Sequence, residues 1–233
     1  MSHVVYKEKA DKRAEAVTAL GQRLVQHYIG QETIVRAGGF EKAADIIKNS
    51  LPTNKRIRSG DLAELLATEF LAEKTAYKAP ILKLRYKSDR NTALHGDDII
   101  GIDSSNARPL VVKGEVKSRA GFYPSHVTPA LEQLDANDGY PNPSTLAFIA
   151  KRLYEQNRDS EGAVLRDMQC AGGLRPADIH HLLFVVCGNN CEATLKAVSQ
   201  PLNTKINGRC STAIVVKKHA DFIAAVFASC HGK

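Results

Sequence analysis

Three short segments between residues 81 and 118 constrain the fold more than any other part of the chain. Residues 81–87 alternate apolar and basic side chains, which is the two-residue period of a half-buried strand. Residues 96–102 and 110–117 are two further, mainly apolar segments, separated by a polar turn at 104–108. Together they predict a three-stranded meander with acidic residues at the entrance to its second strand.

Helical periodicity accounts for most of the chain on the N-terminal side of this meander. Apolar side chains at steps of four predict an amphipathic helix over 6–29, and a second helix is expected over 40–51. A basic linker, 54–58, then leads to Ser59, which we predict to cap a third helix that ends near Lys74. The first part of the chain is therefore expected to be helical.

Helices and strands alternate on the C-terminal side of the meander. Their expected ranges are helices at 129–136, 143–156, 163–170, 192–199 and 220–229, and strands at 181–187 and 213–217. Such alternation indicates an α/β fold, with a mixed central sheet flanked by helices.

The composition favours a nucleic-acid partner. The chain has 32 Lys and Arg against 25 Asp and Glu, a net charge of +7, and a basic surface attracts polyanions by releasing their condensed counterions. A solvated basic face without such a partner is the ordinary alternative. No segment comes near the roughly 18 consecutive apolar residues of a membrane span, and the charged N-terminus lacks a secretory core, so we expect a cytoplasmic protein.

Five cysteines, an odd number in a chain without an export signal, predict reduced thiols. Cys187 and Cys191 lie near His180 and His181, and this combination of residue types can bind zinc. Cys187, however, ends an apolar run, where a cysteine usually behaves as a small buried hydrophobic residue. A buried role is therefore favoured over zinc.

The segment that ends in Glu115-Val116-Lys117 carries the predicted chemistry. Residues i and i+2 of a strand project from one face about 6.6 Å apart, so Glu115 and Lys117 share a face. If the preceding strand, which opens at Asp97-Asp98, pairs with this one, a second carboxylate comes next to Glu115. Two convergent carboxylates suit Mg²⁺, and a nearby lysine can orient or deprotonate an attacking water. The alternative is a surface ion pair on an edge strand beside an acidic turn.

The order of these elements resembles the core of the PD-(D/E)XK nuclease superfamily. Within it, four segments resemble the HamA family, the nuclease subunits of Hachiman anti-phage systems, to which the AbpA proteins are related. They are Ser59-Gly60-Asp61-Leu62-Ala63-Glu64-Leu65-Leu66, Leu82-Lys83-Leu84, His95-Gly96-Asp97-Asp98 and Gly114-Glu115-Val116-Lys117. The resemblance implies a restriction-endonuclease-like nuclease domain over 55–233. A basic, helical N-terminal extension, 1–54, would precede it and serve for docking or for holding DNA.

The resemblance also implies roles for particular residues. Asp98 and Glu115 correspond to metal ligands and Lys117 to the catalytic lysine, with Mg²⁺ as the ion and Mn²⁺ as its alternative. Glu64 corresponds to the helix glutamate that contacts metal or water in many members of the superfamily, and it is therefore a further candidate catalytic and metal-binding residue. Glu69 is the alternative for this position, because it lies closer to the apolar stripe of the same helix.

Other side chains are candidates for contact with nucleic acid. Basic residues around the expected strands either follow a phosphate backbone or form the solvated face of a strand. They are Lys83, Arg85, Lys87, Arg90 and Arg119. Gln133 is similar in position to the helical glutamine of exonuclease-like members, although Asn137 replaces the tyrosine expected four residues later. The roles of Asp97 and His95 are left open.

The resemblance implies a Mg²⁺-dependent nuclease effector that hydrolyses DNA and is controlled by a helicase partner subunit. The alternative is a catalytically inactive nuclease fold that binds DNA or scaffolds a complex. Two carboxylates repel a phosphate backbone unless a cation is present, so a binding module has no use for them. A stand-alone restriction or junction-resolving enzyme is a third interpretation.

Overall fold

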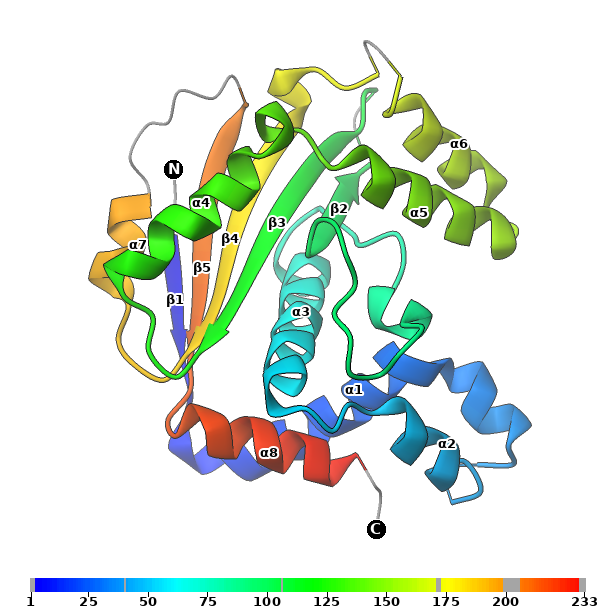
Figure 1. Cartoon of the computed structure of the whole chain (residues 1–233), viewed down its shortest axis with the longest axis vertical. Helices are drawn as coiled ribbons and strands as arrows, with labels where there is room; N and C mark the ends of the chain where they lie inside the picture. The colour runs from blue at the N-terminus through cyan, green and yellow to red at the C-terminus, as the bar shows by residue number, and fades with distance from the viewer. Residues whose placement is uncertain (1–2, 40, 106, 171–172, 199–205, 231–233) are drawn as a thin grey trace.

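A five-stranded sheet in the order β1-β5-β4-β3-β2 forms the centre of the computed structural model (Figure 1). The strands are β1 (His3–Lys7), β2 (Ile99–Asp103), β3 (Leu110–Arg119), β4 (Ile179–Cys187) and β5 (Gly208–Val215). Four strands run parallel to one another and β2 runs antiparallel to β3, so the predicted mixed sheet is confirmed. The structure describes residues 3–39, 41–105, 107–170, 173–198 and 206–230.

Helices surround this sheet. The α-helices of the described residues are α1 (Arg13–Arg36), α2 (Ala44–Ser50), α3 (Lys55–Lys74), α4 (Val127–Asp135), α5 (Pro143–Glu155), α6 (Asp159–Asp167), α7 (Glu192–Val198) and α8 (His219–Ser229). Short 3-10 helices are η1 (Ala10–Lys12), η2 (Lys83–Tyr86), η3 (Pro124–His126), η4 (Asn137–Gly139) and η5 (Pro176–Asp178). No helix in the described part of the chain is long and apolar enough to span a bilayer.

Helices pack on both faces of the sheet because its inner strands are apolar on both sides. Val112 and Val116 of β3 pack in one cluster with residues of α1, α3 and α8, whereas Val111 packs in another with α5 and α6. A third cluster joins α4 and α7 to β4 and β5, and Figure 1 shows α4 in front of these strands. Since successive strand residues point to opposite faces, Glu115 and Lys117 project to the side of Val111, where α4 and α5 lie.

The N-terminal segment differs from the predicted helix. Residues 3–7 form β1, which pairs in parallel with β5, and α1 begins only at Arg13. α1 continues beyond residue 29, through a kink at Gly30, to Arg36. A five-residue strand has little periodicity of its own, and its partner lies at the other end of the chain. The expectation of a purely helical segment over 1–54 is therefore wrong at β1, while the domain boundary at residue 54 stays a prediction.

Residues 81–87 do not form the predicted strand. Lys83–Tyr86 is the 3-10 helix η2, and β2 is bordered on that side by an isolated bridge at Lys78. The basic side chains reach inward instead of alternating into solvent: Lys83 Nζ donates to the carbonyl oxygen of Asp97 at 2.6 Å. The predicted meander is thus reduced to the β2–β3 hairpin, because alternation alone does not show whether a segment has a neighbouring strand.

Helix α3 begins one turn earlier than predicted. Asn54, and not Ser59, is its N-cap, since the Asn54 side chain accepts hydrogen bonds from two backbone N–H groups of the first turn. The predicted linker over 54–58 therefore forms the first turn of α3. Ser59 faces β3 instead, and its Oγ lies 2.8 Å from Ser118 Oγ. The predicted end at Lys74 is confirmed.

The predicted order of elements in the C-terminal half is confirmed. Strands β4 and β5 and helices α4 to α8 appear in the expected sequence, with α6 and β5 beginning earlier than predicted. In the N-terminal half, α2 is shorter than the predicted range 40–51. Residues 40 and 199, at the ends of two predicted helices, lie outside the described residues.

Candidate functional site

Asp98 and Glu115 lie side by side where β2 meets β3. The antiparallel register pairs Ile99 with Gly114, so the next facing residues are Asp98 and Glu115. Asp98 Oδ2 also accepts a hydrogen bond from the backbone N–H of Val116 at 2.8 Å. A Cβ on Gly114 would lie 2.1 Å from Ile99 Cγ2, so glycine is what lets the two strands approach this closely. The structure thus brings together the two carboxylates that the predicted site requires.

Lys117, on β3, is the third residue of the predicted site, after Asp98 and Glu115. Its Nζ forms an ion pair with Glu115 Oε1, and the two side chains are 25% and 13% exposed, so the pair is accessible from solvent. Burial, and then the negative charge of Asp98, raise the pKa of Glu115 to about 7, and Lys117 offsets part of this increase. The alternative of a simple surface ion pair between Glu115 and Lys117 does not account for the second carboxylate, Asp98, that lies beside them.

Glu64 of α3 approaches Asp98 from the other side. Glu64, Asp98 and Lys83 line one small cavity of about 20 Å³, enough for a single water or ion. Burial raises the pKa of Glu64 to about 8, with a further increase from Asp98 and a partial offset by Lys83. Glu69, the alternative, faces α1 instead: its carboxylate lies 2.9 Å from His27 Nε2 and 3.0 Å from Arg23 Nη1. The structure therefore places Glu64, and not Glu69, beside Asp98.

The donor set of this site fits an ion that keeps part of its water shell. Burial also raises the pKa of Asp98, so three carboxyl groups, on α3, directly before β2 and on β3, resist holding full negative charge together. Across the described ranges, no group of three His, Cys, Asp or Glu is arranged to hold a metal ion. The residues present thus offer two adjoining carboxylates, Asp98 and Glu115, with Glu64 behind Asp98. Mg²⁺ typically takes one or two protein carboxylates and fills its remaining positions with water and phosphate oxygens.

Three of the predicted nucleic-acid contacts are used inside the protein. Lys83 donates to the carbonyl oxygens of Asp97 and Asp98, which holds the loop before β2 in place. Arg85 donates to the carbonyl oxygen of Gln26 in α1. Lys87 pairs with Asp61 at 2.7 Å, and both side chains are buried. The interpretation as a solvated strand face is wrong, because residues 83–86 form η2, while contact of these side chains with nucleic acid stays a prediction.

The other candidate contacts lie at the surface. Arg90 Nη1 is 3.4 Å from the carbonyl oxygens of residues 48 and 49. Arg119 is exposed at the end of β3, two residues beyond Lys117. Gln133 on α4 and His95 before β2 are exposed as well. A role of these residues in nucleic-acid binding stays a prediction.

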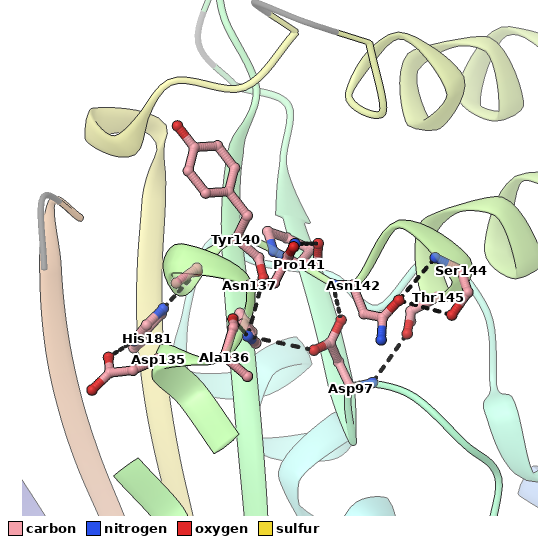
Figure 2. A network of polar contacts seen from close by, with 12 residues as sticks. Asp97, Asp135, Ala136, Asn137, Tyr140, Pro141, Asn142, Ser144, Thr145 and His181 are labelled. Atoms are coloured by element: carbon pink, nitrogen blue, oxygen red, sulfur yellow. Dashed lines mark hydrogen bonds and ion pairs between the residues drawn. The ribbon is translucent and has the colours of Figure 1, made fainter. Parts of the chain in front are cut away.

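Asp97 belongs to a separate buried network, shown in Figure 2. Its N–H donates to Thr145 Oγ1 at 3.0 Å, and its Oδ2 accepts from the N–H of Asn142 at 2.7 Å. Lys113 Nζ lies 3.8 Å from Asp97 Oδ1. Gly96 precedes Asp97 with φ +92°, and a Cβ there would lie 2.1 Å from Thr145 Oγ1. Asp97 therefore ties the loop that carries Asp98 to the start of α5.

Lys113 connects this network to the turn between α4 and α5. Its Nζ donates to the carbonyl oxygens of Ala136 at 2.8 Å and Tyr140 at 3.0 Å, and its side chain is 4% exposed. The sequence analysis did not single out Lys113. A lysine among the apolar residues of a strand, on the same face as Glu115, was the available signal.

Within the described ranges, no group of three His, Cys, Asp or Glu side chains gathers around Cys187 and Cys191. Cys187 Sγ and Cys191 Sγ are 3.3 Å apart and buried, and the five cysteines are free thiols. His180 Nδ1 lies 2.7 Å from the hydroxyl of Tyr77, and His181 Nε2 lies 2.8 Å from the carbonyl oxygen of Gly139. The buried hydrophobic role that was favoured for Cys187 agrees with its place in the core cluster beneath α4 and α7.

Comparison with known proteins identifies the family of this chain. Residues 2–230 match the model of the HamA family. The Hachiman protein HamA of Bacillus cereus is 24% identical over 186 residues, which are 76% of this chain and 66% of that protein. The chain thus spans a little under two thirds of the length of this relative. Because the family model covers nearly the whole sequence, the chain belongs to the HamA family.

Proposed function

We propose that this protein is a metal-dependent nuclease with a PD-(D/E)XK site formed by Asp98, Glu115 and Lys117. The observation that carries the proposal is the pairing of β2 with β3, which brings the carboxylates of Asp98 and Glu115 together beside the ammonium group of Lys117. The name of its relative in Bacillus cereus, Hachiman protein HamA, supports a place in anti-phage defence. The substrate would be DNA, whose backbone the basic chain attracts.

The proposed mechanism assigns one task to each side chain. Asp98 and Glu115 would hold Mg²⁺, or Mn²⁺ in its place, which when bound polarises the phosphodiester and the attacking water. Asp98 is held for this task by the N–H of Val116, so its carboxylate needs little rearrangement. Lys117 would orient the water and neutralise charge that develops on the phosphate. In the free protein Lys117 is paired with Glu115. The metal ion would therefore compete with Lys117 for the carboxylate of Glu115, and the substrate phosphate would compete with Glu115 for the ammonium group of Lys117.

Glu64 would act from behind Asp98. It lines the same cavity, and its raised pKa of about 8 means that it retains a proton at neutral pH while no cation is present. A cation beside Asp98 would lower this pKa and allow the Glu64 carboxylate to accept a hydrogen bond from a bound water. We propose Glu64 as the third acidic residue of the site.

The test is cleavage of plasmid and linear DNA by the purified chain with Mg²⁺, alone and with a helicase partner subunit. We expect Glu115→Gln and Lys117→Met each to lower the rate by about 100-fold or more, the scale of removing one group that acts in the transition state. The matched controls are Glu132→Gln and Lys151→Met, which change exposed residues on α4 and α5. Circular dichroism would verify that all four variants are folded. Equal cleavage by the site variants and the controls would refute the assignment.

The same experiment separates the nuclease from an inactive DNA-binding or scaffold subunit. An inactive module would bind DNA without needing a divalent ion, and Glu115→Gln would then strengthen binding by removing a negative charge. A nuclease would bind more tightly with Mg²⁺ than with EDTA. Control by a helicase subunit, which the family resemblance suggests, would appear as co-purification of the two chains and as a change in cleavage when both are present.

A further inference from the structure

A basic pocket of about 420 Å³ lies between the first turns of α3 and α8, which we call the α3–α8 pocket. The residues that matter for its charge are Lys55, Arg56 and Arg58 of α3 and Asp221 of α8. With three Lys or Arg side chains against one acidic residue, the pocket is positive. Figure 1 shows the start of α3 and α8 close together, at the end of the sheet where β3 finishes. The nuclease mechanism proposed above makes no use of this pocket.

Hydrogen bonds attach the α3–α8 pocket to the strand that carries Glu115 and Lys117. Ser118 directly follows Lys117, and its Oγ lies 2.8 Å from Ser59 Oγ and 3.0 Å from His219 Nε2. Both of these partners line the pocket. Ser118 and Lys117 point to opposite faces of β3, so the pocket and the proposed active site lie on either side of the same strand. The two sites are therefore neighbours across one edge.

Strand β3 extends beyond its ladder with β2. The ladder between β2 and β3 ends at the pair Ile99 and Gly114, whereas β3 continues to Arg119. In the part of the chain that the structure describes, no strand pairs with residues 115–119 on that side, and Ser59 of α3 contacts Ser118 there. A chain of phosphates that runs along this part of β3 would pass from Lys117 to the first turn of α3.

The cations of the pocket are arranged to meet an anion. Lys55 and Arg56 are exposed, and neither forms an ion pair with a residue that the structure describes. Arg58 is held in place, since its Nε donates to the carbonyl oxygen of Pro52 at 2.6 Å and its guanidinium lies 5.2 Å from the ring centroid of Phe227. One fixed cation with two free ones beside it matches a phosphate group, which arginine binds through a planar fork.

We propose that the α3–α8 pocket binds a backbone phosphate of the nucleic-acid strand, close to but distinct from the phosphate that is cleaved. The inference rests on the proposed nuclease function for its ligand, and on the pocket for its position. A polynucleotide held at Lys117 carries further phosphates on both sides of the scissile one, and Lys55 and Arg56 offer positive charge to them from the pocket that adjoins the same strand. Contact there would hold the strand in place without taking part in the chemistry.

The test is the salt dependence of DNA binding by the double variant Lys55→Ala/Arg56→Ala. Binding of a short fluorescent duplex would be measured by anisotropy in the non-cleaving Lys117→Ala background, at several KCl concentrations. Each phosphate contact contributes about 0.9 to the slope of log affinity against log salt, so we expect the slope to fall by about 1 to 2 and affinity at low salt by about tenfold. Lys55→Arg/Arg56→Lys keeps both charges and should bind like the parent.

The matched control is Lys151→Ala/Arg166→Ala, which removes two exposed charges from α5 and α6 and should leave the slope unchanged. In the cleaving protein, the pocket variant should raise KM while kcat stays within about threefold of the parent. Equal slopes for the pocket variant and the control would overturn the inference, even if Glu115→Gln abolishes cleavage. The inference would also be overturned if the pocket variant failed to bind a partner protein but bound DNA like the parent. The ligand of the pocket would then be an acidic surface of that protein. If the parent neither cleaves nor binds DNA, the nuclease proposal itself fails.

Discussion

Replacing Lys113 by methionine removes the cation that connects Asp97 to the turn between α4 and α5, and it keeps a side chain of similar length. Lys113 Nζ donates to the carbonyl oxygens of Ala136 and Tyr140 and lies 3.8 Å from Asp97 Oδ1. Methionine therefore leaves two carbonyl groups and one buried carboxylate without this partner. We expect the variant to be strongly destabilised and the loop before Asp98 to lose its support.

The magnitude follows from these contacts. Two unit charges 3.8 Å apart attract by about 4 kcal/mol at an effective dielectric constant of 20, and desolvation cancels much of this. Removing one partner of a buried pair costs about 3–5 kcal/mol, which is our expected loss of unfolding free energy for Lys113→Met. Asp97→Asn keeps an acceptor for the N–H of Asn142 and should cost about 1–3 kcal/mol. In the double variant no charge is left unpaired, so its cost should fall short of the sum by about 1 kcal/mol or more.

The assay is urea unfolding of the four proteins of this double-mutant cycle, followed by circular dichroism. Lys151→Met, at an exposed position on α5, is the control for loss of a lysine and should change stability by about 0.5 kcal/mol or less. The cleavage rate of each variant, measured below its unfolding range, reports on the loop that carries Asp98. If the two single changes add up to within about 0.5 kcal/mol of the double variant, Lys113 and Asp97 are not coupled and the reasoning is wrong.

Other predictions test the acidic cluster and the glycines. The raised pKa values of Glu115 (about 7) and Glu64 (about 8) mean that the folded protein holds protons which the unfolded chain releases. The stability from these groups is complete below about pH 4.5, their ordinary pKa, and is lost as the pH rises from there through about 7 and 8. Tm measured in EDTA should therefore fall across this range, less in Glu64→Gln and less with Mg²⁺, and a rise in Tm would contradict the assignment. Gly96→Ala should lower the unfolding free energy by about 2 kcal/mol or more, because alanine would need φ +92° and would collide with Thr145. The control Gly39→Ala is also at positive φ but in open space, and it should cost about 1 kcal/mol. Gly60→Ala, within α3 and also in open space, should raise stability by about 0.5–1 kcal/mol in the same urea assay.

Local sequence was sufficient for the part of the site that lies on one hairpin. Spacing by two residues places Glu115 and Lys117 on one face of any strand, and sequential strands tend to pair, which brought Asp98 beside them. Glu64 was found by resemblance, and its position beside Asp98 depends on how α3 packs on the sheet. Residues 3–7 could not be assigned in the same way, because β1 exists only through its pairing with β5.

The basic residues show why the rest of the site could not be predicted from the sequence. Lys87 and Lys113 are buried against carboxylates, and the partner of Lys87, Asp61, lies 26 positions earlier in the chain. Lys55 and Arg56 are of the same types and stay exposed. Which of these roles a cation takes depends on the carboxylates and carbonyls that folding brings within its reach, and this is a property of the tertiary structure. The net charge of +7 therefore indicates a polyanionic partner only through the cations that the fold leaves unpaired, and Lys55 and Arg56 remain so beside the strand that carries Glu115 and Lys117.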